Sequence, residues 1–250
     1  MGIGLLAALL IGLSLGLLGS GGSILTVPVL VYLLEQPEKV AIAGSLVIVG
    51  GIALVSSLSY LRAGQVDGRS VLWFGLPGMA GTWVGAMLSA WISGTVQLLL
   101  FATVMLAAAV LMARPPKLVA AGVEQPLRSA WKIGMDGLLV GILTGLVGVG
   151  GGFMIVPALV LLGGLSMRVA VGTSLLVIAL KSLSGAIGYW QVLPANSFDW
   201  PLIGMFILIG AVGGALGERV SSRIPQAALR KGFAVFLVVM AIAIFWKNLA

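Results

Sequence analysis

One basic residue, Lys181, lies well inside a long apolar stretch of the sequence, 13 residues beyond Arg168. A charged side chain in such a stretch is costly, which favours a functional interpretation. An ammonium group there could hold an anionic substrate by electrostatic attraction. The alternative is that the long side chain reaches the water interface and leaves only its stem among apolar groups.

Two hydroxyl residues, Thr173 and Ser174, precede Lys181 in the same stretch. Their O–H groups could donate hydrogen bonds to the oxygens of a substrate. Small hydroxyls in apolar helices also bond to their own helix backbone or to a neighbouring helix. The sequence leaves both roles open, and we treat Thr173 and Ser174 as candidate substrate-binding residues.

Two glycine-rich segments, GSGGS at 19–23 and GVGGG at 148–152, stand at corresponding places in the two halves of the chain. Each glycine disfavours a helix by about 1 kcal/mol relative to alanine, so we expect the helix to break there. A helix that restarts after such a break presents unpaired N–H groups and a partial positive charge, which attract anions. We therefore predict that both segments bind the substrate, through Gly21, Gly22, Ser23, Gly150, Gly151 and Gly152.

Further glycines lie just upstream of each segment at the spacing of small packing positions. In the first half they are Gly12, Gly16 and Gly19, and in the second half Gly141, Gly145 and Gly148. We predict that these six allow close contact between helices and do not touch the substrate.

Several kinds of chemistry are excluded by what the sequence lacks. It has no cysteine, no histidine and only 7 acidic residues, which removes disulfides, thiolate metal sites and histidine proton transfer. It also has no GxxxxGK[ST] loop of the kind that binds ATP phosphates. We expect no enzymatic activity, no cofactor and no bound metal.

The composition indicates an integral membrane protein. Apolar residues make up 60% of the chain and charged residues only 8%, whereas a soluble domain has about 25% charged residues. The mean hydropathy is +1.19. The net charge of +7 reads first as a membrane-topology signal, so we expect the lipid bilayer and no nucleic acid as a partner.

Eight apolar stretches must position these residues. Six of them have the length of a single membrane-crossing helix, at 39–61, 70–92, 95–113, 168–190, 200–217 and 226–246. The stretches 3–34 and 133–162 hold the glycine segments and are too long, since a helix of 30 residues would measure about 45 Å. We predict that each is a re-entrant hairpin that breaks near mid-membrane and returns, surrounded by protein or a water-filled cavity.

The two halves of the chain align with each other. Shifted by 129 positions, KVAIAGSL at 39–46 falls on RVAVGTSL at 168–175, Tyr60 on Tyr189, and Ile52 on Lys181. Asp67 and Asp199 correspond after a slip of three residues, and both stand where a helix N-cap is expected. The alignment predicts a first repeat at 1–113, a linker at 114–132 and a second repeat at 133–250.

The loop charges predict how the repeats are oriented. Arginine and lysine gather in the segments 62–69, 114–132 and 218–231, whereas the loops equivalent to the first and last of these carry none. The positive-inside rule makes the three basic segments cytoplasmic and both termini periplasmic. We therefore predict an all-α integral membrane protein of two inverted-topology repeats, each a glycine-broken re-entrant hairpin plus three transmembrane helices. The two glycine segments would face each other near the midplane.

The paired segments GLLGSGGSILTVPVL and GLVGVGGGFMIVPALVLL, followed by RVAVGTSLLVIALKSLSG and LRKGFAVFLVVMAI, resemble the TauE/SafE sulfite exporter family of bacterial permeases. The resemblance covers essentially the whole chain. It implies a multi-pass inner-membrane protein that carries small sulfur-containing anions, such as sulfite or organosulfonates, without ATP. The first half departs from the family pattern, with GSGGS for the fuller glycine run and AGSL for GTSL.

Other functions remain open from the residues alone. They are an anion channel lined by the two hairpins, a permease for another small organic anion, a non-transporting membrane scaffold, and a sodium symporter that uses backbone carbonyls. The sequence also leaves open whether the chain forms a homo-oligomer.

Overall fold

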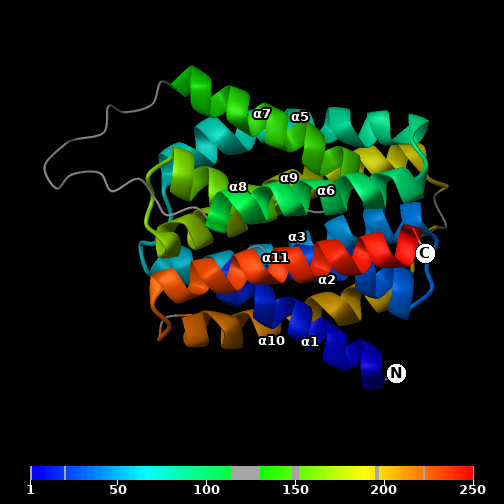
Figure 1. Ribbon diagram of the computed structural model, residues 1–250, viewed down its shortest axis with the longest axis horizontal. Helices are drawn as coiled ribbons and strands as arrows, with labels where there is room; N and C mark the ends of the chain where they lie inside the picture. The colour runs from blue at the N-terminus through cyan, green and yellow to red at the C-terminus, as the bar shows by residue number, and fades with distance from the viewer. Residues whose placement is uncertain are drawn as a thin grey trace, which may run out of the picture.

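The computed structural model describes residues 2–19, 21–113, 130–147, 152–194, 197–221 and 223–249. Within these ranges the regular structure is helical throughout. The helices form a bundle in which the long helices run along a common direction (Figure 1). The linker residues 114–129 and the glycines Gly148, Gly150 and Gly151 lie outside the described residues.

Six helical segments of the described chain are long and apolar enough to cross a membrane. Five are α3 (Glu38–Arg62), α6 (Gly94–Ala113), α9 (Met167–Val192), α10 (Trp200–Ser221) and α11 (Gln226–Leu249). The sixth is a continuous run of α4 (Gly68–Ser70), η2 (Val71–Gly75), α5 (Leu76–Leu88) and η3 (Ser89–Trp91). The six membrane-length helices predicted from the sequence are thereby confirmed in number and place as candidate spans.

The two repeated aspartates begin corresponding crossings. The Ser70 amide donates to Asp67 Oδ2 at 2.8 Å, and the Leu202 amide donates to Asp199 Oδ1 at 3.0 Å. Each carboxylate satisfies one of the amides that a helix leaves unpaired in its first turn. The predicted N-cap role of both residues is confirmed.

The first glycine segment does break a helix. α1 (Gly2–Leu18) ends just before Gly19, whose φ of +73° is a left-handed conformation that glycine adopts at little cost. The chain then folds back as α2 (Gly21–Pro28) and η1 (Val29–Leu33). A Cβ added at Gly22 would lie 2.4 Å from the Ile11 carbonyl oxygen, so α2 lies directly against α1.

The second half has the same order of elements. α7 (Ala130–Val147) is followed by α8 (Gly152–Pro157) and η4 (Ala158–Leu162). In both halves the short returning helix ends at a proline, and a π-helical turn follows directly. Pro28 and Pro157 lack the N–H that would continue the regular α-helical pattern.

The main helix contacts join one half of the chain to the other. α1 packs on α10, α7 on α5, α3 on α9 and α6 on α11. A Cβ at Gly16 would lie 2.0 Å from the Gly214 carbonyl oxygen, and a Cβ at Gly145 would lie 2.0 Å from the Thr82 carbonyl oxygen. Gly145 is the counterpart of Gly16 in the second half, and Thr82 is the counterpart of Gly214 in the first half. The two contacts are therefore equivalent, and they confirm the packing role predicted for Gly16 and Gly145.

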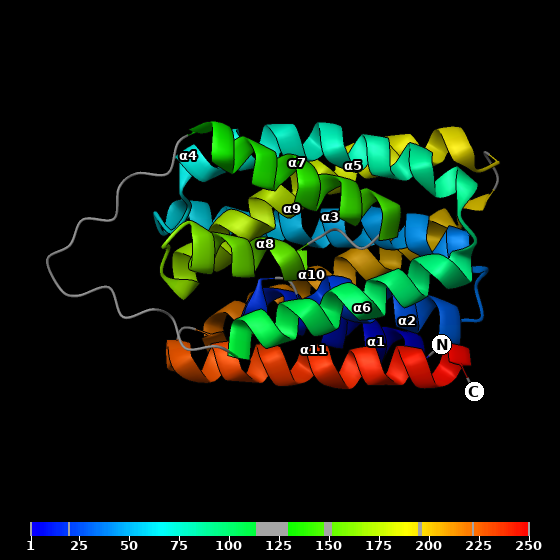
Figure 2. The same cartoon turned by 45° about the horizontal axis from the view of Figure 1, so that its top comes forward.

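The two ends of the bundle differ in charge. Both chain termini lie at one end, and α6 ends and α7 begins at the opposite end (Figure 1). α4, which carries Arg69, and the turn from α10 to α11, which carries Arg223, lie at that opposite end as well (Figure 2). Equivalent helices α1 and α7 therefore start from opposite ends.

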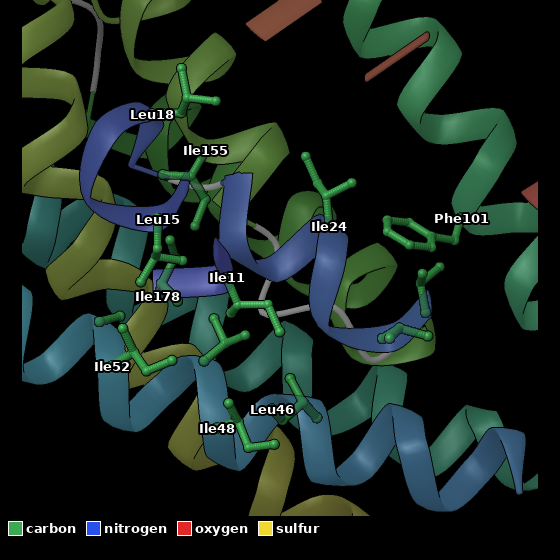
Figure 3. Packing of buried hydrophobic residues seen from close by; sticks show 14 of the residues in the cluster. Ile11, Leu15, Leu18, Ile24, Leu46, Ile48, Ile52, Phe101, Ile155 and Ile178 are labelled. Atoms are coloured by element: carbon green, nitrogen blue, oxygen red, sulfur yellow. The ribbon is translucent and has the colours of Figure 1, made fainter. Parts of the chain in front are cut away.

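The core is built around the hairpins. Figure 3 shows Ile11 and Leu15 of α1, Ile24 of α2, Ile155 of α8 and Ile178 of α9 meeting in one cluster, and all five are buried. Because nearly all of α2 is buried among other helices, the broken backbone at its start is kept away from lipid, as a membrane protein requires.

Candidate functional site

A tyrosine holds the end of each long hairpin helix. The Tyr60 hydroxyl donates to the Gly16 carbonyl at 3.1 Å, and the Tyr189 hydroxyl donates to the Gly145 carbonyl at 3.1 Å. Both carbonyls belong to the last turn of their helix, where the backbone oxygens have no partner in the helix itself. The aligned tyrosines therefore have the same structural task.

These tyrosines mark how deep each hairpin reaches. A Cβ at Gly172 would lie 2.9 Å from Tyr60 Cβ, so the tip of α1 lies level with Gly172 of α9, whereas the tip of α7 lies level with Tyr189. From 172 to 189 the helix rises by about 25 Å. The ends of α1 and α7 therefore lie at different levels along α9. Gly148, Gly150 and Gly151 lie outside the described residues, so the facing of the two glycine segments near the midplane stays a prediction.

The different levels follow from the length of the entering helices. α1 has 17 residues and α7 has 18, about 25 Å each, which is more than half of a hydrocarbon core about 30 Å thick. Each entering helix is long enough to pass the middle of such a core, and α2 and α8 contact each other. The described parts of the two hairpins lie side by side, and α1 and α7 end at different levels along α9.

The candidate glycines of the first segment lie inside a helix. Gly21, Gly22 and Ser23 form the first turn of α2, and all three are buried. The missing side chains of Gly21 and Gly22 let α2 approach α1, so packing as well as helix breaking requires them. Gly152 is the first residue of α8. Binding of a substrate by these residues stays a prediction.

The two candidate hydroxyls are engaged within the protein. Ser174 Oγ donates to the Val171 carbonyl at 2.8 Å and lies 3.1 Å from the Gly19 carbonyl oxygen, which joins α9 to the tip of the first hairpin. Thr173 Oγ1 accepts from the Asp67 amide at 2.8 Å. Ser174 is thus next to a glycine segment, whereas Thr173 holds the loop before α4. A role for either in substrate binding stays a prediction.

Lys181 is fully buried, with an exposed fraction of 0%. Its Nζ lies 5.4 Å from the centroid of the Phe74 ring and has no hydrogen-bond partner in the described part of the chain. A Cβ at Gly78 would lie 3.0 Å from Lys181 Cε, so the side chain runs along α5. The side chain is buried along its whole length, and these contacts place it against η2 and α5.

One buried polar residue, Gln97 of α6, was not singled out from the sequence. Its Nε2 donates to the Leu146 carbonyl at 2.8 Å and to the Tyr189 hydroxyl at 3.3 Å. Its Oε1 has no hydrogen-bond partner among the described residues. The amide therefore supports the end of α7 just before the second glycine segment. The available signal was an amide side chain within the apolar stretch 95–113.

The comparisons with known proteins agree on one family. Residues 4–244 match the family described as sulfite exporter TauE/SafE. The chain is 33% identical over 247 residues to a probable membrane transporter protein of Xylella fastidiosa, over 96% of this chain and 93% of the relative. It is 27% identical over 263 residues to a probable membrane transporter protein of Haemophilus influenzae, over 97% of each chain. A probable membrane transporter protein of Bacillus subtilis, YunE, is 27% identical over 261 residues and 93% of each chain. No solved structure matches.

The helical bundle and its buried, broken helices define a multi-pass membrane protein. With the match over nearly the whole chain, the class is that of a membrane transporter. The chain belongs to the TauE/SafE sulfite exporter family.

Proposed function

We propose that this protein is a secondary transporter, independent of ATP, that moves small sulfur-containing anions such as sulfite or organosulfonates across the bacterial inner membrane. The observation that carries the proposal is Lys181, a fully buried amine with no hydrogen-bond partner in the described ranges, in a member of a family named for sulfite export. An intramembrane charge of this kind marks a substrate or ion pathway by default.

The substrate would bind where the broken helices and α9 come together. The first turn of α2 contains Gly21, Gly22 and Ser23 and stands at the start of a helix, where backbone amides favour anions, and Ser174 adjoins the same hairpin tip. The proposed set is completed by Thr173, Lys181, Gly152 and the glycines Gly150 and Gly151. Because the tips lie at different levels, the anion would meet the two segments in succession and not both at once.

The proposed membrane topology is that of two inverted repeats, 1–113 and 133–250. It is supported by the exchanged contacts of Gly16 and Gly145 and by the opposite starting ends of α1 and α7. Under the positive-inside rule the end with Arg69 and Arg223 is cytoplasmic, which places the linker 114–132 inside and both termini in the periplasm. The chain has no cysteine, so single cysteines added at each terminus and in the linker can be labelled in intact cells. Labelling of the linker but not the termini by an impermeant reagent would contradict this topology.

The substrate is tested by a thermal-shift panel on purified protein, followed by transport in proteoliposomes. The panel contains sulfite, sulfate, thiosulfate, taurine, sulfoacetate and short carboxylates. We expect stabilisation by at least one sulfur oxyanion or sulfonate and its saturable transport without ATP. Stabilisation only by cationic or neutral solutes would overturn the proposal, and currents without saturation would show a channel instead.

A further inference from the structure

Lys181 and Ile52 occupy the same niche in the two halves of the molecule. Lys181 lies over Gly78 and beside Phe74. A Cβ at Gly210 would lie 2.3 Å from Ile52 Cδ1, and the residue that corresponds to Phe74 is Phe206. A glycine and a carbonyl oxygen from the neighbouring hairpin helix recur in both niches, and the sequence has an aromatic residue at the corresponding position of each half. Since isoleucine fills one of them, packing does not require lysine in the other.

The niche offers a charged amine few stabilising contacts. The Phe74 ring is the one aromatic partner found for Nζ in the described part of the chain, and a ring face compensates only a small part of the cost of burying a charge. A charge in such a place is favourable only when an opposite charge accompanies it. An anion arriving beside it would change this balance, because it would supply the missing opposite charge.

The charged and titratable groups near Lys181 are carried by elements other than η2 and α5, which its side chain contacts. Within the described residues, α5, η2, α8 and η4 carry no Asp, Glu, Lys or Arg. The other elements near this part of α9 and α9 itself carry Glu38, Lys39, Tyr60 and Arg62 (α3), Lys132 and Asp136 (α7), Arg168 and Tyr189 (α9), and Arg230, Lys231 and Lys247 (α11). Asp136 precedes Gly137, whose carbonyl borders Gly78, and it has interactions of its own.

We propose that Lys181 is the proton-binding site that couples anion transport to the proton gradient, an inference that rests on the proposed function. The empty protein carries Lys181 as a neutral amine through its change of access. The amine lone pair takes a proton from water on the side where the anion enters, and the ammonium group returns it to water on the side where the anion leaves. No other bond changes, and a monoanion then crosses together with one proton.

The first test uses the unmodified protein in proteoliposomes, with equal potassium on both sides and valinomycin to hold the membrane potential at zero. The probe is an anion from the panel that the protein transports, preferably a sulfonate, because it stays ionised at every pH used. A gradient of one pH unit should drive about tenfold accumulation of a monoanion, with acidification inside reported by a trapped pH dye. Uptake without proton movement would overturn the inference and leave the proposed function intact. No uptake of any anion would contradict the proposed function itself.

The second test compares Lys181→Arg with Lys181→Met. Arginine keeps a permanent charge, since it does not deprotonate in proteins. It should therefore preserve exchange of internal for external anion but lower net uptake at least tenfold relative to exchange. Methionine should abolish both. The ratio of net uptake to exchange can be measured with any transported anion, sulfite included.

The matched control is Lys247→Met, because Lys247 also lies over an aromatic ring, 4.7 Å from the Tyr32 centroid, but is exposed. It should leave exchange, net uptake and proton movement unchanged. If arginine at 181 transports protons and anions as well as lysine does, the inference is wrong. If Asp136→Asn removes proton movement while Lys181→Met keeps it, the coupling site is Asp136 and the assignment to Lys181 is wrong. Size-exclusion profiles of every variant show whether it is folded.

Discussion

The two halves of this transporter hold their hairpins alike but differ at the polar positions beside them. Tyr60 and Tyr189 make the same bond to equivalent glycine carbonyls. Lys181 replaces Ile52, however, and Thr173 replaces Gly44. The shared positions build the scaffold, since backbone bonds and close packing must be met in both halves. The differing positions are free to carry chemistry, which is why they are the better guide to substrate and coupling.

The Thr173 difference has a visible consequence. The Thr173 hydroxyl oxygen accepts a hydrogen bond from the Asp67 amide. At the equivalent place Gly44 lines a small cavity together with Leu30, Gln36 and Asp199. A hydrogen bond therefore occupies the position of Thr173, whereas the corresponding position of Gly44 borders a cavity.

The largest expected effect comes from breaking what the halves share. Gly16→Ala and Gly145→Ala would each bring a Cβ to 2.0 Å from a backbone oxygen of the facing helix. Neither backbone can move far, so each should lose stability at or above the upper end of the roughly 1–3 kcal/mol range for overpacking. Thermal unfolding in detergent measures this. Gly4→Ala is the control, because nothing lies within 4 Å of its added Cβ. Equal losses in all three variants would refute the close contact.

The next effect comes from giving the first half the lysine of the second. Ile52→Lys removes a fully buried apolar side chain and places an amine in its niche, which should cost about 2–3 kcal/mol of the free energy of unfolding. The reverse change, Lys181→Ile, should keep or raise the melting temperature while it abolishes transport. A Lys181→Ile protein that unfolds would mean that the lysine is structural.

A smaller effect is expected from the tyrosine hydroxyls. Tyr60→Phe and Tyr189→Phe each leave a buried glycine carbonyl without its donor, at a cost of about 1 kcal/mol. The loss should be greater for Tyr189, because Gln97 also contacts its hydroxyl. Chemical denaturation followed by tryptophan fluorescence measures both. The double variant Tyr189→Phe with Gln97→Leu should recover part of the loss if the two residues act together.

The smallest effect, and one of opposite sign, is expected at Gly44. Among the described residues, an added Cβ would have only Leu30 Cδ1 within 4 Å, at 3.9 Å. Gly44→Ala should therefore stabilise the protein by up to about 1 kcal/mol through helix propensity. Thr173→Ala should instead destabilise it, because the Asp67 amide loses its acceptor. Changes of the same sign at both positions would mean that the two sites do not differ as described.

Much of the fold could be predicted from the sequence because its signals are local. The six membrane-length helices, the break at Gly19 and the caps at Asp67 and Asp199 follow from apolar length, glycine and aspartate placement. The site could be predicted only in part. Lys181 stands out as a charge in an apolar stretch, whereas Gln97 acquires its meaning from Leu146 and Tyr189, which are far away in the chain.

The sequence by itself determined that this is a duplicated, multi-pass membrane protein with two broken helices, because hydropathy and glycine spacing act over single turns and single crossings. Only the tertiary structure decided that each hairpin helix packs on a helix of the other half and that α1 and α7 end at different levels along α9. It also decided that Lys181 has an apolar niche and no partner among the described residues. These features depend on which helices become neighbours. The choice of neighbours depends on how whole helix surfaces fit together, and the residue pattern along a single helix does not contain that information.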